Sequence, residues 1–252
     1  LKNVQAAKKE KTSPKKLVDK YSAKFKDLKK ALNLSFNGFI RTTEKRHILG
    51  AQKFWQACQK DIYKKNYQGL YCVGCEAFKT RKDLVNNRCP EHPHKKLELV
   101  KEENYFFRLS KYQKQLENII EKDQLKIVPK ERKKEVLSFI KSGLKDFSIS
   151  RSLKRAKGWG IPVPNDSQQI IYVWFDALIN YLTGLGYTNN SKLFKIFWLK
   201  NKNILHCLGK GVIRFHAIYW PAMLLSANLP LPTKELVHGY ITLKGQKISK
   251  SL

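Results

Sequence analysis

Two pairs of metal-binding side chains lie close together in the first half of the chain. Cys72 and Cys75 form a C-x2-C pair, and after thirteen residues Cys89 and His92 form a C-x2-H pair. Tetrahedral zinc prefers thiolate and imidazole ligands, and each pair can present two of them from one tight turn. Four unrelated buried residues in a cysteine-rich loop are the alternative interpretation. The repeated spacing favours a closed, structural zinc site, with His92 or His94 as the fourth ligand.

Two lysines near the end of the sequence could bind phosphate. Lys247 and Lys250 are three residues apart in a small, polar segment that follows Gly245. A cationic arm of this kind suits the phosphate chain of a nucleotide. On a basic protein, however, such a pair is more often part of the solvated surface. Only its position after strand, turn and helix units favours a role in nucleotide binding.

A third group of side chains recurs every four residues. Val212, His216 and Trp220 would share one face of a helix predicted over residues 212–225. An ordinary core stripe has the same spacing, and from the spacing alone the core interpretation is the stronger one. These residues become candidates for a binding site only through their surroundings in the sequence.

The first elements that must position these groups are helices. We expect one helix from Pro14, capped by Ser13, and a second one capped by Thr42 or Thr43. Farther along, the patterns predict a strand over residues 104–109, helices over 111–122 and 130–142, and an extended loop over 158–164.

Two apolar runs predict strands of a sheet. Residues 169–175 form a nearly continuous apolar run, which is typical of a strand buried on both faces of a parallel sheet. Residues 203–208 predict a second buried strand, and a glycine turn at 209–211 leads into the next helix. Strand, glycine turn and helix form a unit of nucleotide-binding folds, whose ligands bind at the carboxyl ends of the strands. The predicted fold class is therefore α/β.

The charge of the chain points to a polyanionic partner. Its 252 residues carry a formal net charge of +30, which favours salt-dependent binding of nucleic acid. Only nine of the 50 basic residues are arginine, so a lysine-rich bias spread over exposed helices is the alternative explanation. The charge does not say which nucleic acid would bind.

The cysteine count indicates a reducing compartment. Five cysteines is an odd number, and three of them lie in the metal-like spacing, which fits a cytoplasmic protein better than a secreted one. Cys58 and Cys207 stand alone, and we expect both in the core. No apolar run approaches the roughly 18 residues of a membrane-spanning helix, so we expect no membrane association.

Together these segments resemble one enzyme family. Lys-Ile-Ser-Lys-Ser at residues 247–251 resembles the KMSKS motif of class I aminoacyl-tRNA synthetases, with Ile248 in place of methionine. The neighbouring sequence resembles the methionyl-tRNA synthetases in particular, over nearly the whole chain and in the expected order. The segments that carry this resemblance are residues 71–76, 103–107, 147–151, 158–164, 172–177, 214–224 and 237–251.

The resemblance implies a methionine–tRNA ligase. Enzymes of this family join methionine to ATP, release pyrophosphate and pass methionine to the terminal ribose of tRNA-Met. Because the methionine carboxylate attacks the α-phosphate, positioned cations would supply most of the catalysis. The resemblance assigns this role to Lys250, with Lys247 assisting. ATP would bind together with Mg²⁺ as a substrate.

The resemblance also assigns the two binding sites. Its ATP site comprises Gly209, Lys210, Ile241, Lys247, Ser249 and Lys250. Its methionine pocket comprises Trp174, Ala177, Tyr181, Val212, His216 and Trp220. Aromatic walls suit the thioether of methionine. The knuckle would hold one structural zinc per chain, and tRNA-Met is the expected nucleic-acid partner.

The sequence departs from the family pattern in several places. Gly211 stands where the family usually has aspartate, and Leu178 replaces a common proline. The HIGH motif of the family is absent, and His-Ile-Leu-Gly at residues 47–50, within a predicted helix, only looks similar. Since the chain begins with Leu1 rather than methionine, we expect both ends to be internal to a longer protein. We also expect residues 1–252 alone to be inactive.

The expected organisation is a Rossmann-like nucleotide-binding domain with an insertion. Residues 1–67 would be a helical part of its first half, 68–168 the connective insertion with the knuckle, 169–240 its second half, and 241–252 the KMSKS-type loop. One alternative is another class I synthetase, such as those for leucine, isoleucine or valine, which carry a far larger editing insertion. The other is a non-catalytic zinc-knuckle module that binds RNA.

Overall fold

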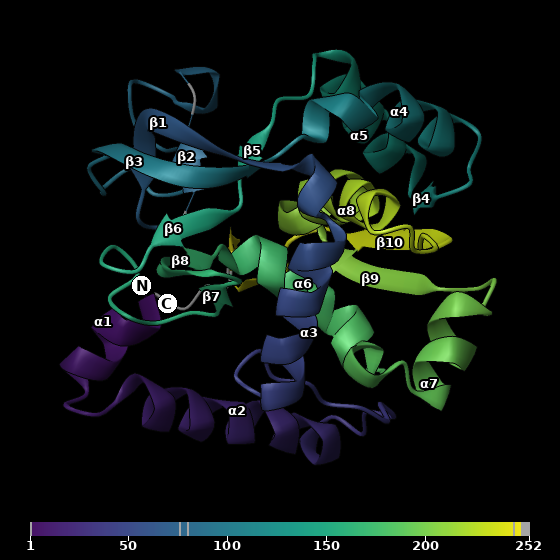
Figure 1. Ribbon diagram of the computed structural model, residues 1–252, viewed down its shortest axis with the longest axis horizontal. Coiled ribbons are helices and arrows are strands. Elements are labelled where there is room, and N and C mark those ends of the chain that lie inside the picture. The colour runs from purple at the N-terminus through teal and green to yellow at the C-terminus, as the bar shows by residue number, and fades with distance from the viewer. Residues whose placement is uncertain (1, 76, 80, 244, 248–252) are drawn as a thin grey trace. The chain divides into compact units, whose positions relative to one another are not determined.

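The structure, a computed structural model, describes residues 2–75, 77–79, 81–243 and 245–247 (Figure 1). The chain divides into two compact units. The first comprises Leu1–Phe39, Lys64–Phe106 and Ser148–Tyr172, and the second comprises Ile40–Tyr63, Phe107–Phe147 and Val173–Leu252. The second unit thus includes residues 107–147, which the sequence analysis placed in the insertion. Within the described ranges, no helix is long and apolar enough to cross a membrane.

The first unit begins with two helices, α1 (Lys2–Lys9) and α2 (Pro14–Ala31). The predicted cap of α2 is confirmed. Ser13 has extended backbone angles, its Oγ accepts a hydrogen bond from the Lys16 amide at 3.2 Å, and Pro14 is the first helical residue. This cap satisfies one of the backbone donors that a helix start leaves unpaired.

Two sheets follow in the first unit. One has the order β2-β1-β3-β5, and the other has the order β6-β8-β7. Their strands are β1 (Ile62–Cys72), β2 (Ala77–Lys79), β3 (Glu98–Phe107), β5 (Phe147–Ser148), β6 (Ser150–Ser152), β7 (Pro162–Val163) and β8 (Asp166–Ile171). The strand predicted over residues 104–109 is the end of the longer strand β3.

The predicted parallel strand over residues 169–175 is wrong. Its first half belongs to β8, which is antiparallel to both β6 and β7, and helix α6 (Val173–Thr183) begins two residues after β8 ends. A short apolar run does not distinguish a buried strand from a buried helix. In α6, Phe175, Leu178 and Ile179 are all buried, at the spacing of a helix face that packs on a core.

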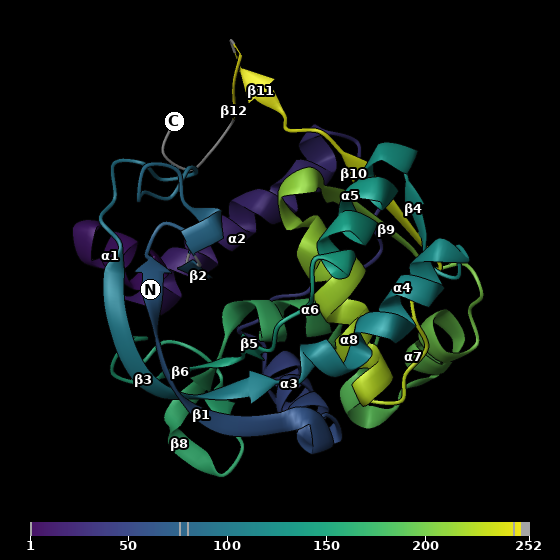
Figure 2. The ribbon, with the colours of Figure 1, turned by 90° about the horizontal axis from the view of Figure 1, so that it is seen from above.

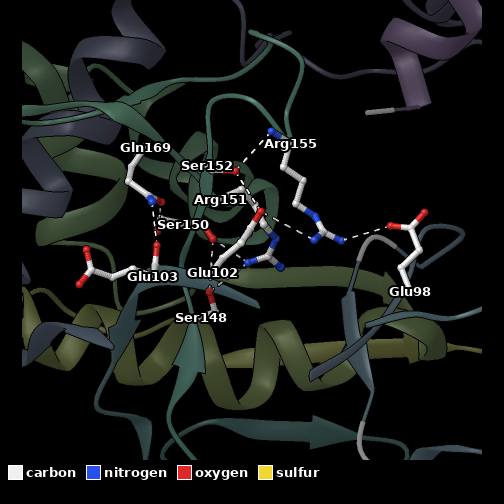
Figure 3. A network of polar contacts seen from close by, with 9 residues as sticks. All are labelled: Glu98, Glu102, Glu103, Ser148, Ser150, Arg151, Ser152, Arg155 and Gln169. Carbon is white, nitrogen blue, oxygen red and sulfur yellow. Dashed lines mark hydrogen bonds and ion pairs between the residues drawn. The ribbon is translucent and has the colours of Figure 1, made fainter. Parts of the chain in front are cut away.

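Polar side chains join the strands of the first unit (Figure 3). Ser150 Oγ donates a hydrogen bond to Gln169 Oε1 at 2.7 Å, and Gln169 Nε2 donates to the Glu103 carbonyl at 2.8 Å. Ser150 and Gln169 are both buried, so these contacts satisfy polar groups that would otherwise destabilise the fold. They tie β6 and β8 to β3.

The second unit contains a parallel sheet of three strands with the order β4-β10-β9. These strands are β4 (Lys126–Val128), β10 (Lys234–His238) and β9 (Leu205–Gly209), and β10 is parallel to both neighbours. The strand predicted over residues 203–208 is confirmed as β9, but only one of its faces is buried. Leu205 is 48% exposed and Cys207 is also exposed, so the prediction of a core position for Cys207 is wrong.

The helices of the second unit pack on one another and on this sheet. Helix α3 packs against α6 (Figure 1), and α5 packs against α4 and β4 (Figure 2). Their bounds are α3 (Lys45–Ala57), α4 (Gln113–Glu121), α5 (Lys130–Lys141), α7 (Lys192–Phe194) and α8 (Trp220–Ser226). The cap predicted at Thr42 or Thr43 is wrong, because α3 begins after Glu44 without a side-chain cap.

The helix predicted over residues 212–225 consists of three consecutive helical segments of different types. A 3₁₀ turn (Lys210–Val212) is followed by a π-helical turn (Phe215–Tyr219) and then by α8. Pro221 lacks the backbone N–H that would continue a regular helix, and the Trp220 amide donates to the Phe215 carbonyl, five residues earlier. π-Helical turns are rare and frequently occur at functional sites.

Candidate metal knuckle and aromatic pocket

The metal-binding candidates lie on two turns of the first unit. Strand β1 ends at Cys72, which is paired with Ala77 at the start of the antiparallel strand β2, and the turn between them carries Cys75. On the second turn, the His92 amide donates a hydrogen bond to the Cys89 carbonyl at 3.0 Å. Each C-x2-C or C-x2-H pair therefore lies on its own tight turn.

The two turns bring four ligand atoms together. All lie within 4.8 Å of one another. Cys75 Sγ is 3.4 Å from Cys89 Sγ and 3.3 Å from His92 Nδ1, and Cys72 Sγ is 3.9 Å from the same nitrogen. In a tetrahedral zinc site with ordinary bond lengths, the ligand atoms lie about 3.5–3.8 Å from one another. The cluster therefore fits a tetrahedral metal ion, and it includes His92 rather than His94.

The surroundings favour this arrangement of ligands. A Cβ atom at Gly74 would lie 2.4 Å from two carbons of the His92 ring, so only glycine leaves room for that ligand. Burial would raise the pKa of the Cys89 thiol, but hydrogen bonds from Cys75, Cys72 and the local backbone lower it below its usual value. Burial and the same contact raise the pKa of the Cys75 thiol to about 12. One thiolate is therefore favoured where the two sulfur atoms meet, and the thiolate is the form that binds metal.

Two arginine side chains pack on aromatic rings of the strands that carry the first pair of ligands. The Arg155 guanidinium lies 4.0 Å from the ring centroid of Tyr71, the residue before Cys72, and forms an ion pair with Glu102 at 3.8 Å (Figure 3). The Arg151 guanidinium lies 4.9 Å from the ring of Phe78 on β2. Cations over aromatic faces are attracted to them. These contacts hold the two strands that present the first pair of ligands.

In the second unit, three of the predicted pocket residues form one hydrogen-bonded chain. The Val212 carbonyl lies 3.1 Å from His216 Nδ1 and can only accept, so Nδ1 carries the proton. Tyr181 Oη then donates to His216 Nε2 at 2.9 Å. Burial lowers the pKa of His216, although its hydrogen bond to Val212 acts in the opposite direction. The imidazole is therefore neutral, with its tautomer set by the backbone.

Aromatic rings surround this chain of hydrogen bonds. Trp220 is fully buried, and its ring centroid lies 6.3 Å from that of Tyr181. Trp174 stacks on Phe215 with centroids 3.9 Å apart and planes at 9°. Ala177 is half-buried on α6, one turn before Tyr181. The structure thus brings Tyr181, Val212, His216 and Trp220 together and places Trp174 against the π-helical turn that carries His216.

The sequence analysis missed other residues of this cluster. His206 on β9 stacks on Tyr181, with centroids 4.2 Å apart and planes at 20°. Trp198 lies 6.0 Å from Trp220 and 6.3 Å from His206 between ring centroids. A histidine inside an apolar strand was a signal that could have revealed His206. For Trp198, which lies on a separate π-helical turn (Lys195–Leu199), the sequence gives no such signal.

The carboxyl ends of β9 and β10 carry the candidate nucleotide residues. Gly209 ends β9, and the Lys210 ammonium that follows lies 4.5 Å from the ring centroid of Tyr240, just after β10. Gly211 is exposed, and a Cβ there would lie 3.3 Å from the Tyr240 ring. Ligands of open α/β sheets bind at this edge. Lys210 and Gly209 are thus placed where such a ligand would lie.

The last candidates follow on a hairpin. Ile241 is 67% exposed, directly before β11 (Thr242–Leu243), which pairs antiparallel with β12 (Gln246–Lys247). Lys247 therefore ends the described part of the hairpin. Ser249 and Lys250 lie outside the described residues, and their predicted contacts with phosphate stay a prediction.

Comparison with known sequences places this chain among tRNA synthetases. A family model described as "tRNA synthetases class I (M)" matches residues 1–98 and 82–252. A methionine–tRNA ligase of Synechocystis sp. is 46% identical over 241 residues, covering 93% of this chain and 44% of that protein. One of Brucella suis is 44% identical over 260 residues, covering 100% of this chain and 49% of that protein.

Solved structures agree with the sequence comparison. A Mycobacterium tuberculosis methionyl-tRNA synthetase in complex with methionyl-adenylate superimposes with a TM-score of 0.90 at 39% identity, covering 100% of this chain and 49% of that one. A second structure of the M. tuberculosis enzyme, also bound by methionyl-adenylate, gives a TM-score of 0.87 and covers 96% of this chain and 48% of that one. The chain spans about half the length of the relatives that it matches.

Proposed function

This chain belongs to the family of methionine-type class I tRNA synthetases, and we propose on that premise that the protein carrying it is a methionine–tRNA ligase. The reaction would join methionine to ATP and then transfer methionine to tRNA-Met. The observation that carries the proposal is the partly buried chain of hydrogen bonds from Tyr181 through His216 to Val212, flanked by aromatic rings. Such a site suits an uncharged, flexible amino-acid side chain.

Methionine would bind with its thioether against these rings. Sulfur–ring contacts stabilise a thioether, and Tyr181, His216 and Trp220 supply both rings and a hydroxyl group of fixed orientation. Because Tyr181 already donates its proton to His216, its oxygen presents only lone pairs to the pocket. This arrangement favours an apolar side chain over one that requires a hydrogen-bond donor.

ATP would bind at the carboxyl ends of β9 and β10, together with Mg²⁺. Gly209 and Lys210 occupy that edge, and Ile241 and Lys247 follow on the adjoining hairpin. The methionine carboxylate is ionised at neutral pH, so its attack on the α-phosphate needs no general base. The reaction needs cations against the growing negative charge on the phosphate oxygens, and we assign this role to Lys250, with Lys247 assisting.

The knuckle would hold one zinc ion through Cys72, Cys75, Cys89 and His92. The donor set of three thiolates and one imidazole, together with the measured spacing, supports zinc. Since four protein ligands complete a tetrahedron, no position is left for a substrate. The metal would therefore stabilise the knuckle and take no part in the chemistry.

The charge of the chain supports tRNA-Met as the partner. A net charge of +30 favours contacts with the phosphate backbone, which weaken as salt is added. The odd number of cysteines, three of them proposed as zinc ligands, suits a reducing compartment such as the cytoplasm.

Methionine-dependent exchange of pyrophosphate into ATP tests this function. The full-length protein should catalyse the exchange with methionine and not with leucine, isoleucine or valine. A Lys250→Ala variant should be much slower at the same methionine affinity, because its contact is made chiefly in the transition state. Exchange driven by another amino acid would refute methionine as the substrate, and the absence of any exchange would favour a non-catalytic RNA-binding module.

A further inference from the structure

A glutamate lies in the buried centre of the parallel sheet. Glu235 is 0% exposed on the central strand β10, where it is paired with Ile127 of β4 on one side and His206 of β9 on the other. Neither carboxyl oxygen has a hydrogen-bond partner among the described residues. A buried polar group without a partner destabilises a fold, so this position requires an explanation.

His206 is the neighbour that can supply the hydrogen bond. It is 4% exposed, and neither ring nitrogen has a partner within the described part of the chain. Glu235 and His206 are directly paired across neighbouring strands, and both side chains lie on the buried face. Neighbouring strands are about 4.8 Å apart, so the two unpaired groups are neighbours on this face. The structure itself draws no hydrogen bond between them, and the bond is part of the inference.

The surroundings keep both groups uncharged. Tyr181 of α6 and His216 of the π-helical turn line the same cluster as His206, and Ile127 is the apolar neighbour on β4. Burial, together with the nearby His216, lowers the pKa of His206 to about 3. Burial alone raises the pKa of Glu235 to about 8. A protonated carboxyl group donates a hydrogen bond, which a neutral imidazole accepts.

His206 connects this carboxyl group to the methionine pocket. Its ring stacks on Tyr181 at 4.2 Å, and Tyr181 donates to His216 at 2.9 Å. We propose that Glu235 and His206 are positioning residues of this pocket: the neutral carboxyl group of Glu235 fixes the His206 ring, which supports the ring of Tyr181. The inference rests on the proposed function, since Tyr181 is assigned there to methionine.

The proposal makes methionine binding sensitive to pH through Glu235. When this carboxyl group ionises, it loses the proton that it donates, and an unpaired negative charge remains in an apolar environment. The carboxylate then leaves its position, and His206 no longer supports Tyr181. Methionine affinity should therefore fall as the pH rises through the pKa of Glu235, about 8.

Equilibrium dialysis of labelled methionine against the full-length protein tests this inference. Between about pH 7 and pH 9, the affinity of the wild-type protein should fall about tenfold relative to that of a Glu235→Gln variant, because only about a tenth of the protein remains competent one pH unit above the pKa. The ammonium group of methionine titrates in the same range, but it does so equally for both proteins. Their ratio of dissociation constants therefore reports Glu235 alone.

A Glu235→Leu variant serves as a second non-titrating control, since an apolar side chain of similar size suits a buried face. Its affinity should be as insensitive to this titration as that of Glu235→Gln but lower at every pH, because leucine donates no hydrogen bond to His206. At saturating methionine, the ratio of the wild-type exchange rate to that of Glu235→Gln should stay constant between about pH 7 and pH 9. Identical pH profiles for the wild type and both variants would overturn the inference. If no form binds methionine at any pH, the proposed function itself fails.

Discussion

Replacement of Glu235 by glutamine should change how the stability of the protein depends on pH. Glutamine has nearly the same shape as protonated glutamate and can still donate a hydrogen bond, but it does not titrate. Glu235 is 0% exposed, so it experiences the full effect of burial. The substitution therefore removes one titrating group and leaves the packing of β10 nearly unchanged.

The sign and size of the effect follow from the shifted pKa. Burial raises the pKa of Glu235 from 4.5 to about 8, so between these values the folded protein holds a proton that the unfolded chain has released. The free energy of unfolding then falls by about 1.4 kcal/mol for each unit of rising pH. From pH 5 to pH 7.5 the wild type should lose about 3 kcal/mol relative to Glu235→Gln.

Equilibrium unfolding in denaturant, followed by tryptophan fluorescence, measures this difference. Trp198 and Trp220 are buried beside the sheet and report on the same unit as Glu235. Other titrating groups affect the wild type and the variant equally, so only the difference between the two curves is compared. A difference that stays constant from pH 5 to pH 7.5 would refute the neutral, buried carboxyl group.

Three further predictions concern the knuckle and the active site. Cys75→Ser should lose about one equivalent of zinc per chain by metal analysis, and reduced wild-type protein without metal would contradict the site. Gly74→Ala should weaken zinc binding about tenfold or more in competition with a chelator, because the added methyl group collides with the His92 ring. Gly38→Ala is the matched control, since nothing lies within 4 Å of that position. Equal losses of zinc from both variants would contradict this reasoning. Trp220→Ala should weaken methionine binding about thirtyfold, because it removes contacts worth about 2 kcal/mol. Lys250→Ala should instead slow adenylate formation and leave methionine affinity nearly unchanged. Equal effects of Lys250→Ala on affinity and on rate would contradict its role.

Features set by neighbours in the sequence could be predicted. The start of α2 at Pro14 depends on Ser13 and a few adjacent backbone groups, so the sequence contains all that is needed. The same holds for the knuckle, where each pair of ligands lies on one tight turn. The spacing indicates His92 but leaves His94 open, because the fourth ligand depends on how the two turns face each other.

Features set by contacts between distant segments could not be predicted. The apolar run at residues 169–175 has the composition of a buried strand, but packing against α3 and the core makes its second half part of a helix. His206 and Glu235 are separated by nearly thirty residues, and only the register of β9 and β10 pairs them. A buried glutamate in a strand gives no signal of its own, since most glutamates are exposed.

ATP-dependent attachment of labelled methionine to tRNA-Met by the full-length protein tests the central claim most directly. We predict attachment that requires ATP and Mg²⁺, decreases in a Trp220→Ala variant through weaker methionine binding, and falls with rising salt as the contacts to tRNA weaken. A purified, zinc-loaded protein that binds tRNA but attaches no methionine to it would contradict the proposed ligase.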